Sequence, residues 1–403
     1  MGRRARRRSR GTRRVVAVRN GVARATTYDV TVNTRPDDAE QQQEQHLAGP
    51  LAESSPEPPA RQPVRVKAPS IRDVARLAGV SHQTVSRVLN NHPSIRSETK
   101  ARVQKVMDDL QYRPNRAARV LATSRSRIIG VITAASSQYG PASSLQAIEQ
   151  AAREKGYFVN TVNVDGSDRE SLERGLNHLL DQSVEGLIVI APQVLAFHMF
   201  AELKVSLPFV TLQSTGSNDE QALSVDQISG ARRATRHLIE QGHRMIVHVA
   251  GPQDWFEAEA RAQGFALEMA AAGLVAPAPV LGDWTALSGA ALGRTLARQR
   301  AAVPPAERFT AIFSANDQMA LGLIHGLAIE GVSVPGDVSI VGFDDMPEAR
   351  FFLPPLTTIR QDFAELGRRS IALLLGDLDE ESPEAGAIVP DLIVRGSTAP
   401  PRG

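Results

Sequence analysis

The chain has 403 residues with 42% hydrophobic side chains, which is enough for two or three domains with buried cores. It contains no cysteine, which excludes a disulfide framework, a zinc finger and thiol catalysis, and no apolar run reaches the ~18 to 20 residues of a transmembrane helix. The net charge of +2 hides an asymmetry, because residues 1–127 carry 26 Lys and Arg against 11 Asp and Glu. A basic first third on an acidic remainder indicates an N-terminal module that faces a polyanion.

Residues 1–67 form a basic, proline-rich extension that we expect to be disordered. They contain the arginine block "GRRARRRSRGTRR", a "QQQEQ" tract and "PLAESSPEPPARQP", with few aromatic residues and no sustained period. The arginine block is compatible with non-specific DNA affinity, but the composition favours a solvated tail or a start codon assigned too far upstream. No apolar stretch follows the block, so no secretory signal is predicted and the cytoplasm is the expected compartment.

Residues 68–113 predict three short helices. Ser70 can cap the first, "IRDVARLAG", and Gly79 supplies the turn before a second helix that opens at Ser81. The third begins at Ser97, in "SETKARVQKVMDDLQY". Apolar residues recur at helical spacing in all three, at Ile71, Val74, Ala75, Ala78, Val85, Val88, Leu89, Val103, Val106, Met107 and Leu110. These are the elements of a helix-turn-helix domain.

The outer face of the second helix carries hydrogen-bonding side chains, namely His82, Gln83, Ser86, Arg87 and Asn90. In a helix-turn-helix the second helix enters the major groove, where Gln pairs with adenine and Arg with guanine. Gln83 and Arg87 share a face, and the hydroxyls of Ser81, Thr84 and Ser86 suit phosphate contacts. The alternative is an amphipathic hairpin with a solvated face. The basic charge of this domain and of the segment after it favours DNA binding.

Residues 114–127 are predicted to be a hinge helix and linker. The stretch "RPNRAARVLATSRSR" has five arginines in fifteen residues, and Pro114 can start a helix. The segment is too short and too polar for a helix that is stable by itself.

Residues 128–398 predict a second, larger domain of the α/β class. Apolar runs alternate with helical stretches, and these runs are "IIGVIT", "YFVNTVNV", "GLIVIA", "FVTLQ", "MIVHVA", "AIFSA" and "VSIVGFDD". Continuous apolar strands alternating with amphipathic helices predict doubly wound parallel sheets. The length indicates two similar lobes with a cleft between them.

Polar side chains that follow the predicted strands point to a ligand site in this cleft. Arg261 follows "MIVHVA", Asn316 and Asp317 follow "AIFSA", and Asp344 and Asp345 end "VSIVGFDD". Together with Trp284 they offer the stacking and hydrogen bonding that bind sugars. Each residue has a structural alternative: Trp284 as a core residue, Asn316 or Asp317 as a helix N-cap, and Arg261 as a surface ion-pair partner. Trp255 receives no role.

The stretches "IRDVARLAGVSHQTVSRVLNN" and "YRPNRAARVLATSRSRIIGVI" resemble the lac repressor (LacI/GalR) family of transcription regulators, and the likeness runs from about residue 71 to 398. The resemblance implies a periplasmic-binding-protein-like sensor and a homodimer on a pseudo-palindromic operator. It also implies a hinge helix, with Asn115 and Ala118 at the DNA, that pushes Leu121 into the minor groove. His82 departs from the tyrosine of the lac repressor branch, which puts the operator base it faces in doubt.

"GDWTALSG" and "LPPLTTIRQDFAELG" resemble the lac repressor branch in particular, whose effectors are galactosides. The resemblance implies effector contacts from Pro141, Arg261, Trp284, Asn316, Asp345, Gln361 and Phe363, with Asp344 making structural hydrogen bonds. It implies no cofactor and no metal. Prolines and no leucine heptads follow the last strand, so a dimer is expected instead of a tetramer.

Two other functions compete with this interpretation. A glycosidase would use Asp317 and Asp345 as its two carboxylates, but nothing marks either as an acid with a raised pKa. A periplasmic sugar carrier would share the two-lobed fold but would carry a signal peptide in place of the DNA-binding domain. The sequence therefore predicts a cytoplasmic, nucleoid-associated repressor, not an enzyme, that responds to a small sugar. The expected sugar is a galactoside or glucoside that releases the operator.

Overall fold

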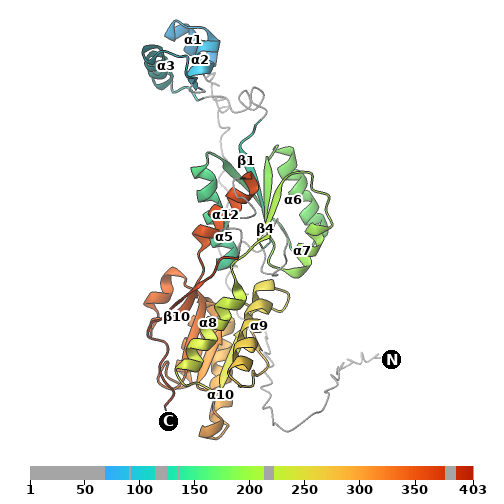
Figure 1. Cartoon of the computed structure of the whole chain (residues 1–403), viewed down its shortest axis with the longest axis vertical. Helices are drawn as coiled ribbons and strands as arrows, with labels where there is room; N and C mark the ends of the chain where they lie inside the picture. The colour runs from blue at the N-terminus through green and yellow to red at the C-terminus, as the bar shows by residue number, and fades with distance from the viewer. Residues whose placement is uncertain are drawn as a thin grey trace, which may run out of the picture.

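The computed structural model describes residues 69–89, 92–113, 125–134, 137–212, 222–376 and 387–402. They form a three-helix body at one end of the molecule and two α/β lobes beyond it (Figure 1). Among the described residues no helix is long and apolar enough to cross a membrane.

The three-helix body has the order predicted for a helix-turn-helix domain. Its helices are α1 (Ile71–Ala78), α2 (His82–Leu89) and α3 (Ser97–Asp109). Ser70 caps α1 in a capping box with Asp73, and Gly79 ends the helix with a left-handed backbone at φ 64°, which L side chains rarely adopt. The predicted apolar stripes meet in one core, whose buried members are Val74, Ala75, Ala78, Val85, Val88, Val103 and Met107.

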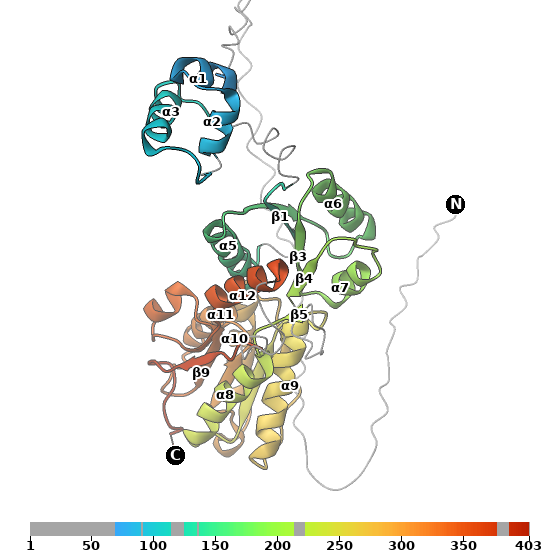
Figure 2. The ribbon, with the colours of Figure 1, turned by 45° about the horizontal axis from the view of Figure 1, so that its top comes forward.

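The first lobe is built on a five-stranded parallel sheet with strand order β2-β1-β3-β4-β5. Its strands are β1 (Ile128–Thr133), β2 (Phe158–Asn163), β3 (Gly186–Ile190), β4 (Phe209–Leu212) and β5 (Ala222–Leu223). Its helices are α5 (Tyr139–Glu154), α6 (Arg169–Asp181), α7 (Val194–Ala201) and, from far along the chain, α12 (Phe363–Leu375). Helix α12 lies beside α5 (Figures 1 and 2), where Gly367 leaves no room for a Cβ against the backbone of Ala147.

The second lobe has a six-stranded sheet with order β11-β10-β9-β8-β6-β7. Its strands are β6 (Ile246–Ala250), β7 (Val280–Leu281), β8 (Ala311–Ser314), β9 (Ser339–Asp344), β10 (Thr357–Arg360) and β11 (Asp391–Ile393). Its helices are α8 (Gln227–Glu240), α9 (Phe256–Ala271), α10 (Ala286–Ala301) and α11 (Asp317–Ile329), with 3₁₀ turns η1 (Pro305–Glu307) and η2 (Pro347–Phe351). Only the edge strand β11 is antiparallel, so the predicted parallel, doubly wound architecture is confirmed with one reversed strand.

The chain passes between the lobes three times. It crosses after β5, after β10, and again before β11. Val225 and Ile388, on the first and third crossings, form a parallel bridge, and the Asp226 N–H donates to the Ile388 carbonyl at 2.8 Å. These crossings hold the carboxyl ends of both sheets toward one cleft.

Candidate functional site

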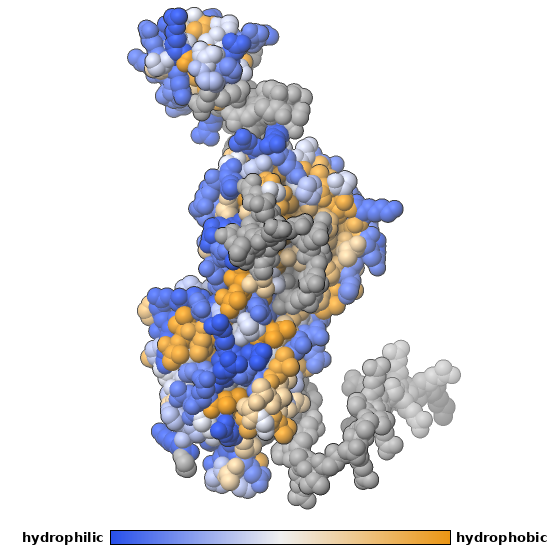
Figure 3. Space-filling view, viewed as in Figure 1, coloured by the Kyte–Doolittle hydropathy of each residue, from blue (hydrophilic) through white to orange (hydrophobic). Residues whose placement is uncertain are grey.

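The outer face of α2 is open. Gln83 and Arg87 are exposed, whereas Val85 and Val88 are buried in the core with α1 and α3. In the described part of the chain the side chains of Gln83 and Arg87 make no hydrogen bond or ion pair. The surface of the three-helix body on the face drawn in Figure 3 is largely hydrophilic. Side chains that are long, polar and unengaged are suited to base edges in a major groove.

The remaining residues predicted to contact DNA fall into two groups. Ser81 caps α2, because its Oγ accepts from the Thr84 N–H at 3.1 Å and lies 3.0 Å from the Thr84 hydroxyl. His82 is exposed and Ser86 half-buried. Four predicted residues lie outside the described residues, namely Asn90, Asn115, Ala118 and Leu121. Their DNA contacts, and the hinge helix, stay predictions.

The second candidate site is a cavity between the two lobes, enclosing about 720 Å³ of space including its mouth. The first lobe contributes the start of α5 and the ends of β3 and β4, and the second contributes α8, α9 and the ends of β8 and β9. Of the seven predicted effector contacts six line this cavity: Pro141, Arg261, Trp284, Asn316, Gln361 and Phe363. Asp345 does not.

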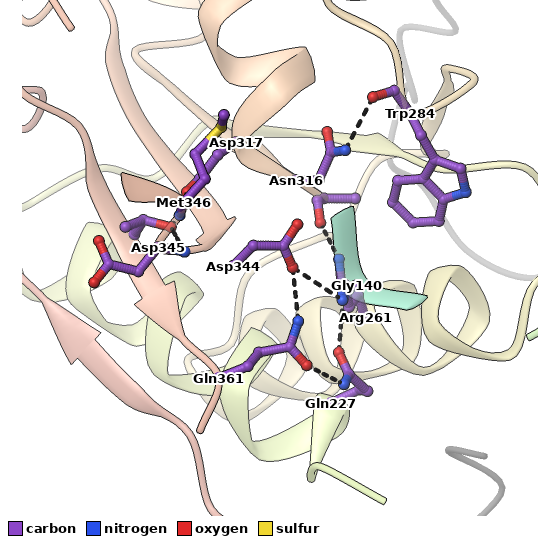
Figure 4. Close-up of polar contacts among 12 residues, drawn as sticks. Gly140, Gln227, Arg261, Trp284, Asn316, Asp317, Asp344, Asp345, Met346 and Gln361 are labelled. Atoms are coloured by element: carbon purple, nitrogen blue, oxygen red, sulfur yellow. Dashed lines mark hydrogen bonds and ion pairs between the residues drawn. The ribbon is translucent and has the colours of Figure 1, made fainter. Parts of the chain in front are cut away.

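A buried polar network organises the floor of the cavity around Arg261, which is 5% exposed (Figure 4). Its Nε donates to Gln227 Oε1 at 2.8 Å, and an Nη donates to the Ala315 carbonyl. Gln227 Nε2 donates to Gln361 Oε1 at 2.8 Å, and Gln361 Nε2 donates to Asp344 Oδ1 at 2.7 Å. The guanidinium closes the ring with an Nη 3.5 Å from Asp344 Oδ1. Arg261 is therefore not a surface ion-pair partner.

The structure places the two adjacent aspartates differently from the expectation for Asp345. Asp345 turns away from the cavity (Figure 4), where it accepts from Arg395 Nη2 at 2.5 Å and from Arg360 Nε at 2.6 Å. Its side chain is 4% exposed and ties β10 to the segment after β11. Asp344 lines the cavity instead. The expectation that Asp345 faces the cleft is wrong, whereas Asp344 makes the structural contacts expected of it, with Gln361 and Arg261, and also lines the cavity.

Asp344 has the features of a functional carboxylate. Burial raises its pKa to about 6, against the lowering effects of the Arg261 charge and the Gln361 hydrogen bond. Its backbone φ is 117°, outside the region that non-glycine residues normally occupy. Such a conformation costs about 1 to 3 kcal/mol and is found mostly at functional sites.

Trp284 and Asn316 combine structural and cavity-lining roles. Asn316 is the N-cap of α11, because its side chain accepts from the Met319 N–H at 2.9 Å. This is the structural role that the sequence predicted as the alternative for Asn316 or Asp317. Its Nδ2 donates to the Trp284 carbonyl at 3.0 Å. The Trp284 ring is 5% exposed and lies against Gly251, where a Cβ would come within 2.2 Å of the ring. Trp284 thus belongs to the lobe core and to the cavity wall together.

Several cavity residues were missed from the sequence. Trp255, which received no role, contacts Trp284 edge to face with ring centroids 5.5 Å apart. Tyr139 contacts Phe363 in the same way at 6.0 Å. Gln227 joins the floor network, and Glu257 lines the wall. A helix start that follows a buried strand was the signal available for Trp255 and Glu257.

The lobes also contact each other directly at the wall of the cavity. Gln193 and Trp255 form an antiparallel bridge, and the Val194 N–H donates to the Asp254 carbonyl at 2.9 Å. The Phe256 N–H donates to the Pro192 carbonyl at 3.1 Å. Since Pro192 and Trp255 also line the cavity, these contacts between the lobes lie at the edge of the site.

The carboxylates of the glycosidase hypothesis do not face the cavity. Asp317 is buried behind it, where it accepts from the Thr358 hydroxyl at 2.5 Å and from the Met346 N–H at 2.9 Å. Burial, with Asp344 nearby, raises the pKa of Asp317 well above the usual value. This carboxyl is nevertheless a structural group, because Thr358 and Met346 hold it. Asp345 is engaged by two arginines. Two carboxylates flanking a substrate bond are therefore not formed by this pair.

Two family profiles match the two parts of the chain. One, described as "Bacterial regulatory proteins, lacI family", matches residues 70–115, and one described as "Periplasmic binding protein-like domain" matches residues 235–398. The lactose operon repressor of Escherichia coli (strain K12) is 32% identical over 334 residues, covering 83% of this chain and 91% of that protein.

Solved structures agree with these matches. The lac repressor dimer bound to operator and the anti-inducer ONPF matches with a TM-score of 0.70 and 32% identity, covering 83% of this chain and 100% of that one. The transcriptional regulator CelR in complex with cellobiose matches with a TM-score of 0.58 and 30% identity, covering 82% and 99%. A helix-turn-helix domain joined to a two-lobed domain around a polar cavity defines a DNA-binding repressor regulated by a small ligand. The chain belongs to the lacI family of bacterial regulatory proteins.

Proposed function

We propose that this chain is a homodimeric repressor of sugar-utilisation genes and that a neutral galactoside or glucoside, bound between the lobes, releases it from a pseudo-palindromic operator. The observation that carries the sugar assignment is the pairing of the Arg261–Asp344–Gln361 network with the aromatic wall of Trp255 and Trp284. Sugars offer vicinal hydroxyls to such a network and apolar C–H faces to such rings.

The relatives support the same assignment. One matched structure carries operator DNA and an anti-inducer, and another carries a disaccharide. The cavity is lined by aromatic side chains and by the polar network around Arg261, a combination that is typical of small-molecule sites. We assign effector contacts to Asp344 and to the six predicted residues that line the cavity, in place of Asp345.

DNA reading is assigned to the exposed face of α2. Gln83 and Arg87 read bases, while Ser81, His82, Thr84, Ser86 and Asn90 complete the groove and phosphate contacts. The hinge residues Asn115, Ala118 and Leu121 add minor-groove contacts. We place the protein in the cytoplasm, in association with the nucleoid.

The test begins with selection of the operator from random duplex DNA by the full chain. Binding of the selected duplex is then measured by fluorescence anisotropy with lactose, cellobiose and methyl β-D-galactoside. We expect a two-fold-symmetric sequence and a loss of affinity with at least one sugar. A selected sequence without symmetry contradicts the dimer, and an affinity unchanged by every sugar contradicts the effector class.

The competing function, a glycosidase, is tested with the same protein. The relatives reported above are named as repressors or as a transcriptional regulator. We expect no release of nitrophenol from nitrophenyl β-galactoside or β-glucoside at protein concentrations that saturate the operator. Turnover of either compound would overturn the assignment of the chain as a regulator without catalytic activity.

A further inference from the structure

One wall of the cavity carries a carboxyl group that none of the interactions above uses. Glu257 stands in the first turn of α9, two residues after Trp255 and one turn before Arg261. Its side chain is partly buried and lines the cavity. Its Oε2 atom is fully buried and has no hydrogen-bond partner in the described part of the chain. Buried polar groups are nearly always paired, so an orphaned carboxylate oxygen beside a cavity calls for an absent partner.

A second orphaned polar atom belongs to the same cavity. The Nε1–H of Trp284 is buried without an acceptor among the described residues. Glu257 Oε2 lacks a donor and Trp284 Nε1–H lacks an acceptor, and both side chains line the cavity between the lobes. A hydroxyl group supplies both functions, because it donates through its hydrogen and accepts through its oxygen. A polyhydroxylated ligand therefore offers both kinds of partner that these atoms lack.

The charge of the cavity narrows the choice of ligand. In the described part of the chain, the titratable groups that line it with Glu257 are Tyr139 from α5, Arg261 from α9 and Asp344 from β9. Arg261 and Asp344 already form an ion pair. Ionised Glu257 adds a negative charge with no counter-ion of its own. A ligand that brings a phosphate or carboxylate to this wall would place like charges together in a buried site, which is unfavourable.

We propose that Glu257 binds the effector, that its Oε2 accepts a hydrogen bond from a ligand hydroxyl, and that it thereby selects neutral glycosides over anionic sugars. This assignment rests on the proposed function, because it names how the same cavity chooses its ligand. Glu257 is a specificity-determining residue for the effector and has no part in DNA reading.

The same geometry links effector binding to pH. Burial, together with the charge of Asp344, raises the pKa of Glu257 to about 7, while Arg261 and a backbone hydrogen bond lower it. A donated hydrogen bond from the ligand favours the ionised carboxylate, so binding releases a proton and tightens as pH rises through about 7. Between pH 6 and pH 8 the ionised fraction rises from roughly a tenth to roughly nine tenths, which gives an affinity change of about tenfold.

The chain carries a natural reporter for the test. It has two tryptophans, Trp255 and Trp284, and both line the cavity, so intrinsic fluorescence reports on this site. The full chain is titrated at pH 6 and pH 8 with lactose, cellobiose, methyl β-D-galactoside and the anionic galacturonate. The variants are Glu257→Gln, which keeps the shape without the charge, and Glu259→Gln, an exposed control on the same helix.

For the neutral sugar that binds, we expect about tenfold tighter binding at pH 8 than at pH 6 in the natural chain and in Glu259→Gln. Glu257→Gln should lose the tenfold difference and keep only the roughly twofold difference that Asp344, with its pKa of about 6, contributes. Its binding should be weaker than that of the natural chain at pH 8, and it should bind galacturonate better. Fluorescence of the ligand-free natural chain should also titrate near pH 7, and that of Glu257→Gln should not. Operator binding by each variant, measured without sugar, confirms that it is folded.

Each remaining result overturns part of the reasoning. Sugar affinity and pH profile unchanged in Glu257→Gln would remove Glu257 from the site while the proposed function stands. Preference of the natural chain for galacturonate over the neutral sugars would overturn the charge argument. Operator binding that persists with no neutral sugar bound at either pH would overturn the proposed effector class, and this assignment with it.

Discussion

Separate replacement of two adjacent aspartates by asparagine is expected to give opposite defects. Asp344→Asn should lower the affinity for the sugar without lowering the free energy of unfolding. Asp345→Asn should lower the free energy of unfolding and leave the sugar affinity unchanged. The reason is their placement, because Asp344 lines the cavity and Asp345 is held by Arg360 and Arg395. The two residues match in chemistry and chain position, so each variant is the control for the other.

The magnitudes follow from the surroundings of each carboxylate. Removal of one partner from a buried ion pair costs about 3 to 5 kcal/mol, and asparagine still accepts one of the two hydrogen bonds, so Asp345→Asn should cost about 2 to 3 kcal/mol. A hydrogen bond from sugar to the Asp344 carboxylate contributes about 1.5 to 3 kcal/mol. Its loss should weaken sugar binding roughly 10- to 150-fold.

The effect of Asp344→Asn on stability depends on pH in a defined direction, because the natural chain has a titrating carboxyl here and the variant does not. The folded pKa of about 6 is raised above the ordinary 3.8, so the stability contribution of this carboxyl is present below pH 3.8 and is lost as pH rises through about 6. By pH 8 the loss is about 3 kcal/mol, which asparagine avoids. The pKa of about 6 already includes the attraction of the Arg261 charge, so the loss of this attraction in the variant is not counted again. We therefore expect Asp344→Asn to be at least as stable as the natural chain at pH 8.

Urea unfolding followed by circular dichroism measures the stability of each variant, and tryptophan fluorescence measures its sugar affinity. Loss of sugar binding in Asp345→Asn, together with natural affinity in Asp344→Asn, would refute the placement of the two side chains. A drop of several kcal/mol in the stability of Asp344→Asn would show that burial of this carboxylate is better compensated than its surroundings indicate.

Three predictions concern the DNA-binding half. Arg87→Ala should cost about 1 to 3 kcal/mol on the selected operator and relax preference at one base pair, and an equal loss on random DNA would mean a phosphate contact. Leu121→Ala should reduce operator affinity and DNA bending, measured by fluorescence transfer, with sugar affinity unchanged; an unaltered bend would remove the wedge. Gly79→Ala should destabilise the three-helix body by about 1 to 2 kcal/mol, because φ is 64° there, and thermal unfolding unchanged from the natural chain would contradict that reason.

Local patterns in the sequence were sufficient for the elements and for most of the cavity. The apolar stripes of α1 to α3, the cap at Ser70 and the buried strands each express a short-range periodicity, and each formed as predicted. Strands β5 and β7 were not predicted, because two residues give no readable period. Strand β10 was not predicted either, because its four residues contain a single apolar side chain.

The errors arose where tertiary geometry decides the outcome. Neighbouring residues at a strand end face opposite ways, but which of Asp344 and Asp345 faces the cavity depends on a positive φ that no sequence pattern announces. Trp255 and Glu257 join the site because the start of α9 pairs with the first lobe at Gln193. That contact spans about sixty residues of chain, and periodicity carries no information about it.

The three crossings between the lobes have a consequence for the order in which the domains can fold during synthesis. Helix α12 packs in the first lobe although it follows most of the second lobe in sequence, and Ile388 pairs with Val225 later still. A nascent chain therefore cannot complete either lobe until nearly the whole polypeptide has left the ribosome, because parallel pairing at long range is slow and needs both partners. The three-helix body is contiguous and has no such requirement. We therefore expect the three-helix body to fold during synthesis before either lobe is complete, and we expect that neither lobe can be produced as a separate contiguous fragment.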